Sequence, residues 1–157
     1  MKRLHVHERV RDIDAAVRFY TALFGQSPTV LKSDYAKWQM DDPRVNYAIS
    51  SGRSTHGIDH LGIQTDTAAE LDDVSDRLKR ADRSLFQEED AACCYAVSDK
   101  SWVSDPDGVI WEAFHTMAEA VVMGEDEVRD ANLNTLRVEA KQGSGAEPVT
   151  GKDPCCG

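Results

Sequence analysis

The pattern of apolar and polar positions along the chain begins with a strand and a helix. Residues 3–10 alternate loosely, which predicts a strand with His5 and His7 on one face. Apolar residues then recur at helical spacing, and we expect a helix capped by Asp12 and ended by Gly25. Three short strands are predicted next, over residues 29–31, 36–40 and 45–49.

The same order of elements starts again after a polar linker at residues 50–57. A strand is predicted over residues 58–65, and Thr67-Ala-Ala-Glu70 is a capping box that opens a second helix, with Leu71, Val74 and Leu78 on its buried face. Short strands are expected over residues 84–87, 95–97, 102–104 and 109–115, with a polar loop after the first. This internal repeat predicts an α+β protein of two tandem βαβββ modules, at residues 1–54 and 55–116.

The remaining residues have a different pattern. Residues 117–141 are predicted to be a helical extension, with a short helix over residues 117–123 and a charged helix from Glu125 to Lys141. Residues 142–157 contain Gly143-Ser-Gly-Ala-Glu-Pro and end with a second cysteine pair, which predicts a flexible tail.

Composition narrows the classes of function. The chain has 157 residues, 41% of them apolar, enough for one domain with a buried core. Its formal net charge of −10, without a basic stripe, argues against nucleic acid and membranes as partners. No apolar run suits a signal peptide or a membrane span, so a cytoplasmic protein is expected. Its four cysteines form two adjacent pairs, an arrangement that favours chelation over disulfides.

Alignment of the two repeats brings candidate metal ligands to related positions. His5 and His60 open the first strands of the two copies, and the alignment places Ala48 opposite Glu112. A carboxylate in an apolar strand is costly to bury unless it is paired or bound to metal. Two histidines and one carboxylate leave about three positions open on an octahedral ion, as in non-haem ferrous sites. A fourth ligand at position 48 would favour a closed zinc, nickel or manganese site, so Ala48 favours the open one.

The other histidines are assigned different roles. His7 shares a face with His5 and is a candidate for the pocket beside the ligands. A lone histidine in a strand is by default a structural residue, and His56, His115 and alternatively His7 are read in this way. His115 follows Glu112 by three positions and therefore faces the other side of the strand.

Cys93 and Cys94 are candidates for binding a soft, thiophilic centre. Adjacent α-carbons lie about 3.8 Å apart, closer than the roughly 4.4 Å that disulfide geometry requires. The alternative is a buried pair of small residues in a strand. Lys100 either lowers the thiol pKa or binds an anionic group of a substrate, or it is a solvated surface residue. Cys155 and Cys156 are either a metalloid scavenger or a feature of the tail without function.

Three motifs carry a resemblance to a known family. They are residues 5–20, Asp59-His-Leu-Gly-Ile and Asp105-Pro-Asp-Gly-Val-Ile-Trp-Glu. Together with the repeat, they resemble the vicinal oxygen chelate superfamily over residues 1–116, which implies paired modules around a half-barrel site. This superfamily includes glyoxalases, fosfomycin resistance enzymes and extradiol dioxygenases. The segment Cys93-Cys-Tyr-Ala-Val-Ser-Asp-Lys-Ser-Trp-Val is similar to its branch of cadmium-induced proteins and ArsI carbon–arsenic lyases.

The resemblance implies an Fe(II)- and dioxygen-dependent lyase. It would cleave methylarsenite or trivalent aromatic arsenicals to inorganic arsenite and so give resistance, as a monomer or a homodimer. Cys93 and Cys94 would bind arsenic, and His5, His60 and Glu112 would bind iron. Members of this branch carry Gln where this chain has His5, so other divalent metals can occupy the site. Two alternatives are a non-catalytic cadmium- or arsenite-binding protein and a glyoxalase-like or thiol-transfer enzyme.

Overall fold

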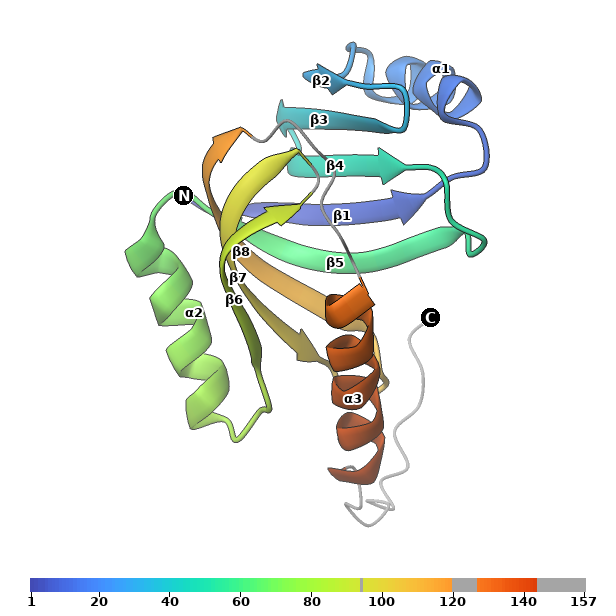
Figure 1. Cartoon of the computed structure of the whole chain (residues 1–157). Helices are drawn as coiled ribbons and strands as arrows, with labels where there is room; N and C mark the ends of the chain where they lie inside the picture. Colours follow the sequence, from blue (N-terminus) through green and yellow to red (C-terminus); the bar gives the residue numbers. More distant parts are fainter. Residues whose placement is uncertain (94, 120–126, 144–157) are drawn as a thin grey trace, which may run out of the picture.

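The fold is built around one mixed eight-stranded sheet within the described residues, which are 1–93, 95–119 and 127–143 of the computed structural model (Figure 1). The strand order is β2-β3-β4-β1-β5-β8-β7-β6. The strands are β1 (Arg3–Arg9), β2 (Val30–Leu31), β3 (Tyr35–Asp41), β4 (Arg44–Ser50), β5 (Gly57–Thr65), β6 (Phe86–Cys93), β7 (Ala96–Ser104) and β8 (Ile110–Glu119). The helices are α1 (Ile13–Phe24), α2 (Ala68–Arg80) and α3 (Glu127–Gly143). The predicted α+β class is confirmed.

The four central strands relate the two repeats. β1 pairs with β4 in parallel and with β5 in antiparallel orientation, and β5 pairs with β8 in parallel. His7 lies opposite His60 across the β1–β5 pair, and His5 lies opposite Gly62. Because alternate residues of a strand share a face, the three histidines project from the same side of the sheet. The two repeats therefore meet at β1 and β5 within one chain.

The first helix follows its sequence signals. Asp12 caps α1 by accepting a hydrogen bond from the Ala15 amide at 2.9 Å, and Gly25 ends the helix with a φ of 69°, a left-handed conformation that glycine adopts without strain. Its apolar side packs aromatic rings over the sheet, with Tyr20 and Phe24 against Trp38. The aromatic packing of α1 forms the core of the first module.

The second helix is capped in a modified way. The Glu70 amide donates to Thr67 Oγ1 at 3.2 Å, as the capping box predicts. The Glu70 carboxylate, however, accepts from the Asp66 amide at 2.9 Å rather than from that of Thr67. Asp66 also pairs with the amino group of Met1 at 2.6 Å, so the segment before α2 is joined to the residues that precede β1.

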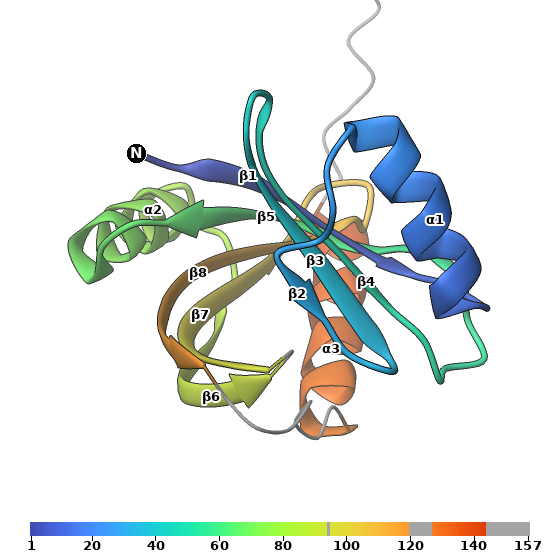
Figure 2. The same ribbon diagram turned by 90° about the horizontal axis from the view of Figure 1, so that it is seen from above.

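Helices α2 and α3 pack on opposite faces of β7. The hydroxyls of Ser101 and of Ser75 in α2 form a hydrogen bond at 2.8 Å, in which either can be the donor. The next residue, Trp102, is fully buried in a cluster with Leu133 and Leu136 of α3. Successive strand residues point to opposite faces, so the helices lie on different sides (Figures 1 and 2). α3 thus covers the face of the second module from which Trp102 projects.

Three predictions for the second half of the chain were wrong. The polar loop expected after residue 87 is part of β6, which pairs with β7 through a bulge between Glu88 and Ala91. The strands expected at residues 95–97 and 102–104 are one strand, β7. β8 continues to Glu119, where a short helix was predicted from Met117. In each case pairing with β7 or within it decides the structure: β6 is an edge strand that tolerates charged side chains, and the end of β8 is held by its pairing with Ala96 and Val97.

The described residues include only part of the segment for which the C-terminal helices and tail were predicted. α3 lies where the charged helix was predicted. The remaining residues of the expected short helix, 120–123, and residues 144–157 of the expected tail lie outside the described residues. Among the helices of the described ranges, none is long and apolar enough to cross a membrane.

Candidate metal centre

Three side chains from the central strands converge on one point. His5 comes from β1, His60 from β5 and Glu112 from β8, and one potential ligand atom of each lies within 4.8 Å of the others. Glu112 Oε2 is 3.7 Å from His5 Nε2 and 3.4 Å from His60 Nε2. All three residues are buried, with exposed fractions of 6%, 3% and 3%. The structure therefore brings together the three residues that the repeat alignment selected.

Strand register explains this convergence. In the parallel β5–β8 pair, Glu112 lies beside Gly62, and in the parallel β1–β4 pair Ala48 lies beside His7. A Cβ atom at Gly62 would lie 2.6 Å from the backbone oxygen of Glu112, so only glycine allows this approach. No role was predicted for Gly62, although a glycine inside a strand is a signal of such a close approach.

Hydrogen bonds to both histidines direct their Nε2 atoms toward Glu112. His5 Nδ1 donates to the backbone oxygen of Asn46 at 3.0 Å, because a carbonyl can only accept. Its Nε2 therefore carries a lone pair whenever the ring is neutral. Burial lowers the pKa of His5 to about 4, which keeps the ring neutral at pH 7. His60 Nδ1 is held in the same way by Asp59 Oδ2 at 2.9 Å.

The charges at the centre favour a cation. Burial opposes charge on His60, but hydrogen bonds to Asp59 and Glu112 outweigh it and raise its pKa. Burial also opposes charge on Glu112, yet Lys100, His60 and His5 together hold its pKa well below the usual value. Without a metal, a proton on His60 compensates the charges of Asp59 and Glu112. A divalent ion bound here would take the place of that proton.

Lys100 is buried beside Glu112 and is not the solvated surface residue that one interpretation expected. Its Nζ lies 2.7 Å from Glu112 Oε1, and only 6% of the residue is exposed. The ion pair occupies one carboxylate oxygen and leaves Oε2 to face the two histidines. The sequence could not show this pairing, because twelve residues and a turn separate the two side chains.

A small cavity opens on the convergent atoms. It has a volume of about 40 Å³, and its wall includes Ala48, Tyr35, Ala96 and Ser98. Ala48 is 1% exposed and contributes only a methyl group. The position related to Glu112 in the first module therefore supplies no fourth protein ligand, and the centre is open on this side.

His7 lies next to the three convergent residues rather than among them. Its Nε2 is 2.9 Å from Ser50 Oγ, and its ring centroid is 5.0 Å from that of His60. His7 also forms a second group of potential ligands with Asp59 and His60. His7 is 4% exposed and lines the cavity.

Asp59 contacts a histidine of the centre in a way that strand alternation does not predict. A regular strand would point Asp59 away from His60, since the two are adjacent. In the β1–β5 register, however, His7 pairs with His60 and Glu8 pairs with Ile58, so Asp59 is the extra residue of a β-bulge. The bulge allows the Asp59 carboxylate to reach the His60 ring.

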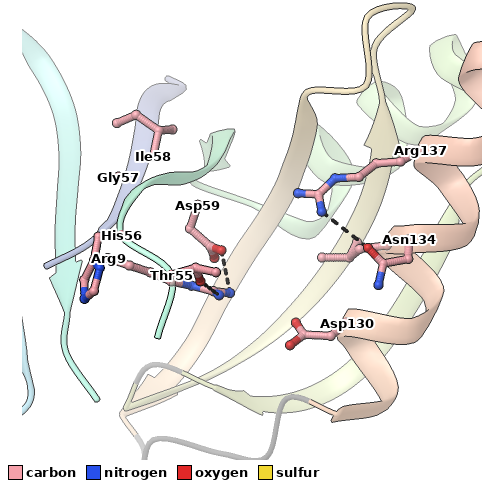
Figure 3. Close-up of a pocket in the computed structure, with 10 residues that line it drawn as sticks. Arg9, Thr55, His56, Gly57, Ile58, Asp59, Asp130, Asn134 and Arg137 are labelled. Carbon is pink, nitrogen blue, oxygen red and sulfur yellow. Dashed lines mark hydrogen bonds and ion pairs between the residues drawn. The ribbon is translucent and has the colours of Figure 1, made fainter. Parts of the chain in front are cut away.

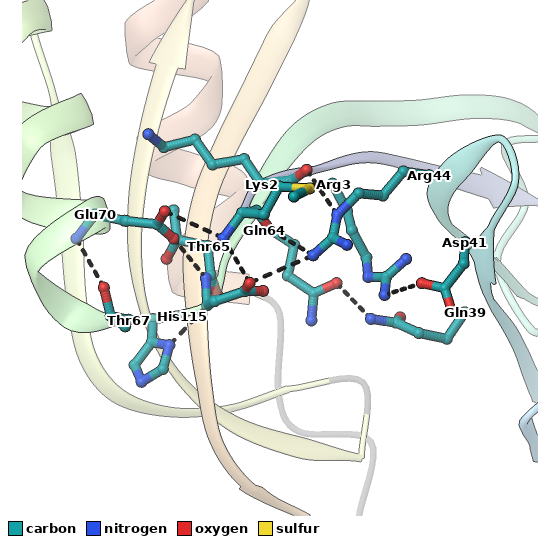
Figure 4. Close-up of polar contacts among 12 residues, drawn as sticks. Lys2, Arg3, Gln39, Asp41, Arg44, Gln64, Thr65, Thr67, Glu70 and His115 are labelled. Carbon is teal, nitrogen blue, oxygen red and sulfur yellow. Dashed lines mark hydrogen bonds and ion pairs between the residues drawn. The ribbon is translucent and has the colours of Figure 1, made fainter.

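The other histidines lie elsewhere. His115 Nδ1 is 3.4 Å from the backbone oxygen of Thr65, at the end of the sheet that carries the α2 cap (Figure 4). His56 is exposed and lines a different cavity.

The thiol residues are described only in part. Cys93 is the last residue of β6, where its backbone pairs with Ala96, one of the residues that line the small cavity. The next described residue, Tyr95, donates from its hydroxyl to Asp34 Oδ1 at 2.7 Å and so ties this hairpin to the first module. Cys94, Cys155 and Cys156 lie outside the described residues.

Comparison with known proteins identifies the family. The sequence model of the Glyoxalase/Bleomycin resistance protein/Dioxygenase superfamily matches residues 2–113, more than half of the chain. The chain belongs to this superfamily. The predicted superfamily and fold are therefore confirmed.

Named relatives are similar to the chain over most of its length. The "Trivalent organoarsenical cleaving enzyme" of Thermomonospora curvata is 34% identical over 122 residues, which cover 76% of this chain and 81% of the relative. The "Cadmium-induced protein CadI" of Mycobacterium bovis is 30% identical over 125 residues, 79% of this chain and 82% of the relative. These relatives carry the names of the predicted branch.

Among solved structures, a Mn(II)-bound glyoxalase from Novosphingobium aromaticivorans aligns with a TM-score of 0.55 and 19% identity, over 80% of this chain and 43% of that chain. An extradiol ring-cleaving dioxygenase from B. fuscum aligns with a TM-score of 0.56 and 14% identity, over 82% of this chain and 35% of that chain. At these identities the structures show the shared fold alone.

Proposed function

We propose that the protein is an Fe(II)- and dioxygen-dependent lyase that cleaves the carbon–arsenic bond of trivalent organoarsenicals and releases inorganic arsenite. The observation that carries this proposal is the convergence of His5 Nε2, His60 Nε2 and Glu112 Oε2, with only a methyl group at position 48. Relatives named as trivalent organoarsenical cleaving enzymes support the substrate class.

The donor set suits a ferrous ion. Two imidazole nitrogens and one carboxylate oxygen are the ligands of open non-haem iron sites, and other divalent metals accept the same atoms. When bound, the iron would supply activation of dioxygen next to the substrate. The protein contributes the neutral imidazole of His5, the imidazole of His60, a carboxylate held ionised by Lys100, and a buried setting that excludes bulk water.

The thiols would select the substrate. Cys93 and Cys94 would bind trivalent arsenic, because thiolates prefer soft centres. The backbone position of Cys93 supports this role, since its partner Ala96 lines the cavity at the metal centre. Binding at the hairpin would hold the carbon–arsenic bond near the open side of the metal, so that positioning is the main contribution of the chain. Release of arsenite from a toxic organoarsenical would underlie a role in resistance.

A second candidate is a binding protein without catalysis. Relatives named as cadmium-induced proteins favour it, and the same thiols would sequester cadmium or arsenite. A glyoxalase-like reaction is less well supported, because a closed Lewis-acid site would require a ligand at the position of Ala48.

One experiment separates these functions. Metal-free protein is reconstituted with Fe(II) and incubated with methylarsenite in air or under anaerobic conditions, and inorganic arsenite is measured by chromatography with arsenic detection. A lyase releases arsenite only with both iron and oxygen, and it does so with multiple turnovers. Arsenic binding without arsenite release under any condition would contradict the lyase and support the binding protein.

A further inference from the structure

A cavity of about 370 Å³ lies between α3 and the start of β5 (Figure 3). Asp59 forms part of its wall, together with Arg9, Leu133 and Arg137. Asp59 Oδ1 forms an ion pair with Arg9 Nη2 at 2.5 Å, and Asp59 Oδ2 accepts a hydrogen bond from His60 Nδ1 at 2.9 Å. The carboxylate therefore connects the wall of this cavity to a histidine of the proposed metal centre.

We propose that Asp59 is a positioning residue, held by Arg9, that fixes the ring of His60 with Nε2 toward the metal. This inference rests on the proposed metal centre and adds to it a residue that does not itself bind the metal.

The hydrogen bonds leave His60 one productive orientation. Nδ1 donates to Asp59, so Nε2 is the nitrogen that faces Glu112 Oε2, at 3.4 Å, and the one left to bind a metal. A ring turned by 180° would leave the Asp59 carboxylate without its donor and would give up a charge-assisted hydrogen bond. A carboxylate behind a metal-binding histidine also makes the histidine more basic and a better ligand.

Arg9 keeps Asp59 in place. Its Nη1 donates to Thr55 Oγ1 at 2.9 Å while Nη2 binds Asp59, so the guanidinium is held at two points (Figure 3). The side chain of Asp59 is 14% exposed; partial burial opposes its charge, but His60, His7 and Arg9 together hold its pKa below the usual value. Thr55 and Arg9 thus form an outer layer around the carboxylate.

A competing arrangement uses the same atoms. His7 Nδ1 lies 3.8 Å from Asp59 Oδ2, so His7, Asp59 and His60 could together hold a second ion. The guanidinium 2.5 Å from the other oxygen of Asp59 opposes another cation there, and 2.9 Å is an ordinary hydrogen-bond length. The positioning role is therefore the better supported of the two.

The test is the affinity of the metal-free protein for Fe(II), measured anaerobically by calorimetric titration without any arsenical. Asp59→Ala is expected to weaken binding by about 10- to 100-fold. Asp59→Asn keeps the shape of the side chain but loses its charge, so its Fe(II) affinity should lie between that of the wild type and that of Asp59→Ala. Asp130→Asn is the matched control, because Asp130 lines the same cavity but pairs with Arg53. The Fe(II) affinity of this variant should equal that of the wild type.

Chemical rescue distinguishes positioning from a general loss of structure. The cavity gives a small anion access to the space vacated in Asp59→Ala, where Arg9 supplies a counter-charge. Added formate should restore at least part of the Fe(II) affinity of Asp59→Ala, whereas formamide, its neutral analogue, should not. Thermal unfolding and circular dichroism of both Asp59 variants establish that they fold.

Three results would overturn the inference. They are wild-type Fe(II) affinity in folded Asp59→Ala, equal effects of formate and formamide, or two Fe(II) ions per wild-type chain with one lost in Asp59→Ala. If instead the wild-type chain binds no Fe(II), the metal centre itself is refuted. If Asp59 behaves as expected but no arsenite is released in the reaction assay, the lyase is refuted and the positioning role is retained.

Discussion

Lys100 and Glu112 form a buried ion pair in which the lysine ammonium takes one carboxylate oxygen, at 2.7 Å, and leaves the other for the two histidines. The pair therefore limits Glu112 to one free oxygen, a constraint that would make it a monodentate metal ligand. It also compensates for the cost of burying the carboxylate, which is 3% exposed.

Replacing Lys100 with Met is expected to destabilise the metal-free protein. The substitution keeps much of the volume but leaves Glu112 with less compensation, so the free energy of unfolding should fall by roughly 3 kcal/mol. Urea denaturation measures this change. Added Fe(II) should reduce the difference from wild type, because a bound cation replaces the missing charge.

Lys79→Met provides the control, since Lys79 is exposed on α2 and its loss should change stability by less than about 0.5 kcal/mol. Equal destabilisation of Lys100→Met with and without Fe(II) would show that no ion binds beside Glu112.

Gly62→Ala should disturb the metal centre through the backbone. A Cβ atom would meet the Glu112 backbone oxygen at 2.6 Å, so β5 and β8 must move apart. A cost of about 1–3 kcal/mol in unfolding free energy is expected from such overpacking, together with weaker Fe(II) binding as Glu112 shifts. Denaturation and anaerobic metal titration measure the two effects.

Gly25→Ala is the control that separates a loss of stability from a loss of Fe(II) binding. Gly25 has a φ of 69° and open space around it, so alanine there should destabilise the protein by about 1 kcal/mol through backbone strain. Fe(II) affinity should not change, because Gly25 ends α1. Loss of affinity in both variants would indicate that metal binding merely follows global stability.

The sequence allowed the fold class and the three convergent residues to be predicted because both depend on a repeat. His5 and His60 occupy the same position of two copies, and the pairing of β1 with β5 brings them to one face. The helix ends at Asp12 and Gly25 could be predicted because capping is a local property.

Features that depend on strand register could not be predicted. Asp59 reaches His60 only because of a bulge, and alternation alone would point it away. Lys100 meets Glu112 across β7 and β8, and the polar segment before Cys93 is a strand because β7 pairs with it. Each depends on contacts between strands that composition and periodicity do not specify.

Ala48→Glu should convert the open centre into a closed one. Position 48 is related to Glu112 by the repeat and lies beside His7 at the cavity wall. A carboxylate buried there without metal should lower the free energy of unfolding, and bound Zn(II) or Mn(II) should restore it. The expected result is tighter Zn(II) binding and loss of oxygen-dependent arsenite release.

Ala48→Gln is the matched control, because it adds similar volume without charge. It should destabilise the protein less and should not increase the affinity for Zn(II) to the same degree. If glutamate and glutamine give the same metal affinities, position 48 does not face the metal.

Replacing Cys93 and Cys94 with Ser tests the assignment of the thiols. Serine keeps the size of cysteine but has little affinity for trivalent arsenic, so methylarsenite binding and arsenite release should both be lost. Fe(II) affinity should stay at the wild-type level, because the proposed ligands His5, His60 and Glu112 come from other strands. Binding is measured by retention of arsenic on the protein after gel filtration.

The matched control replaces Cys155 and Cys156 with Ser, which should leave turnover unchanged if the tail pair only scavenges metalloids. Wild-type arsenite release by the Cys93/Cys94 variant would contradict the role of these thiols, and loss of Fe(II) binding in it would place a thiol at the metal.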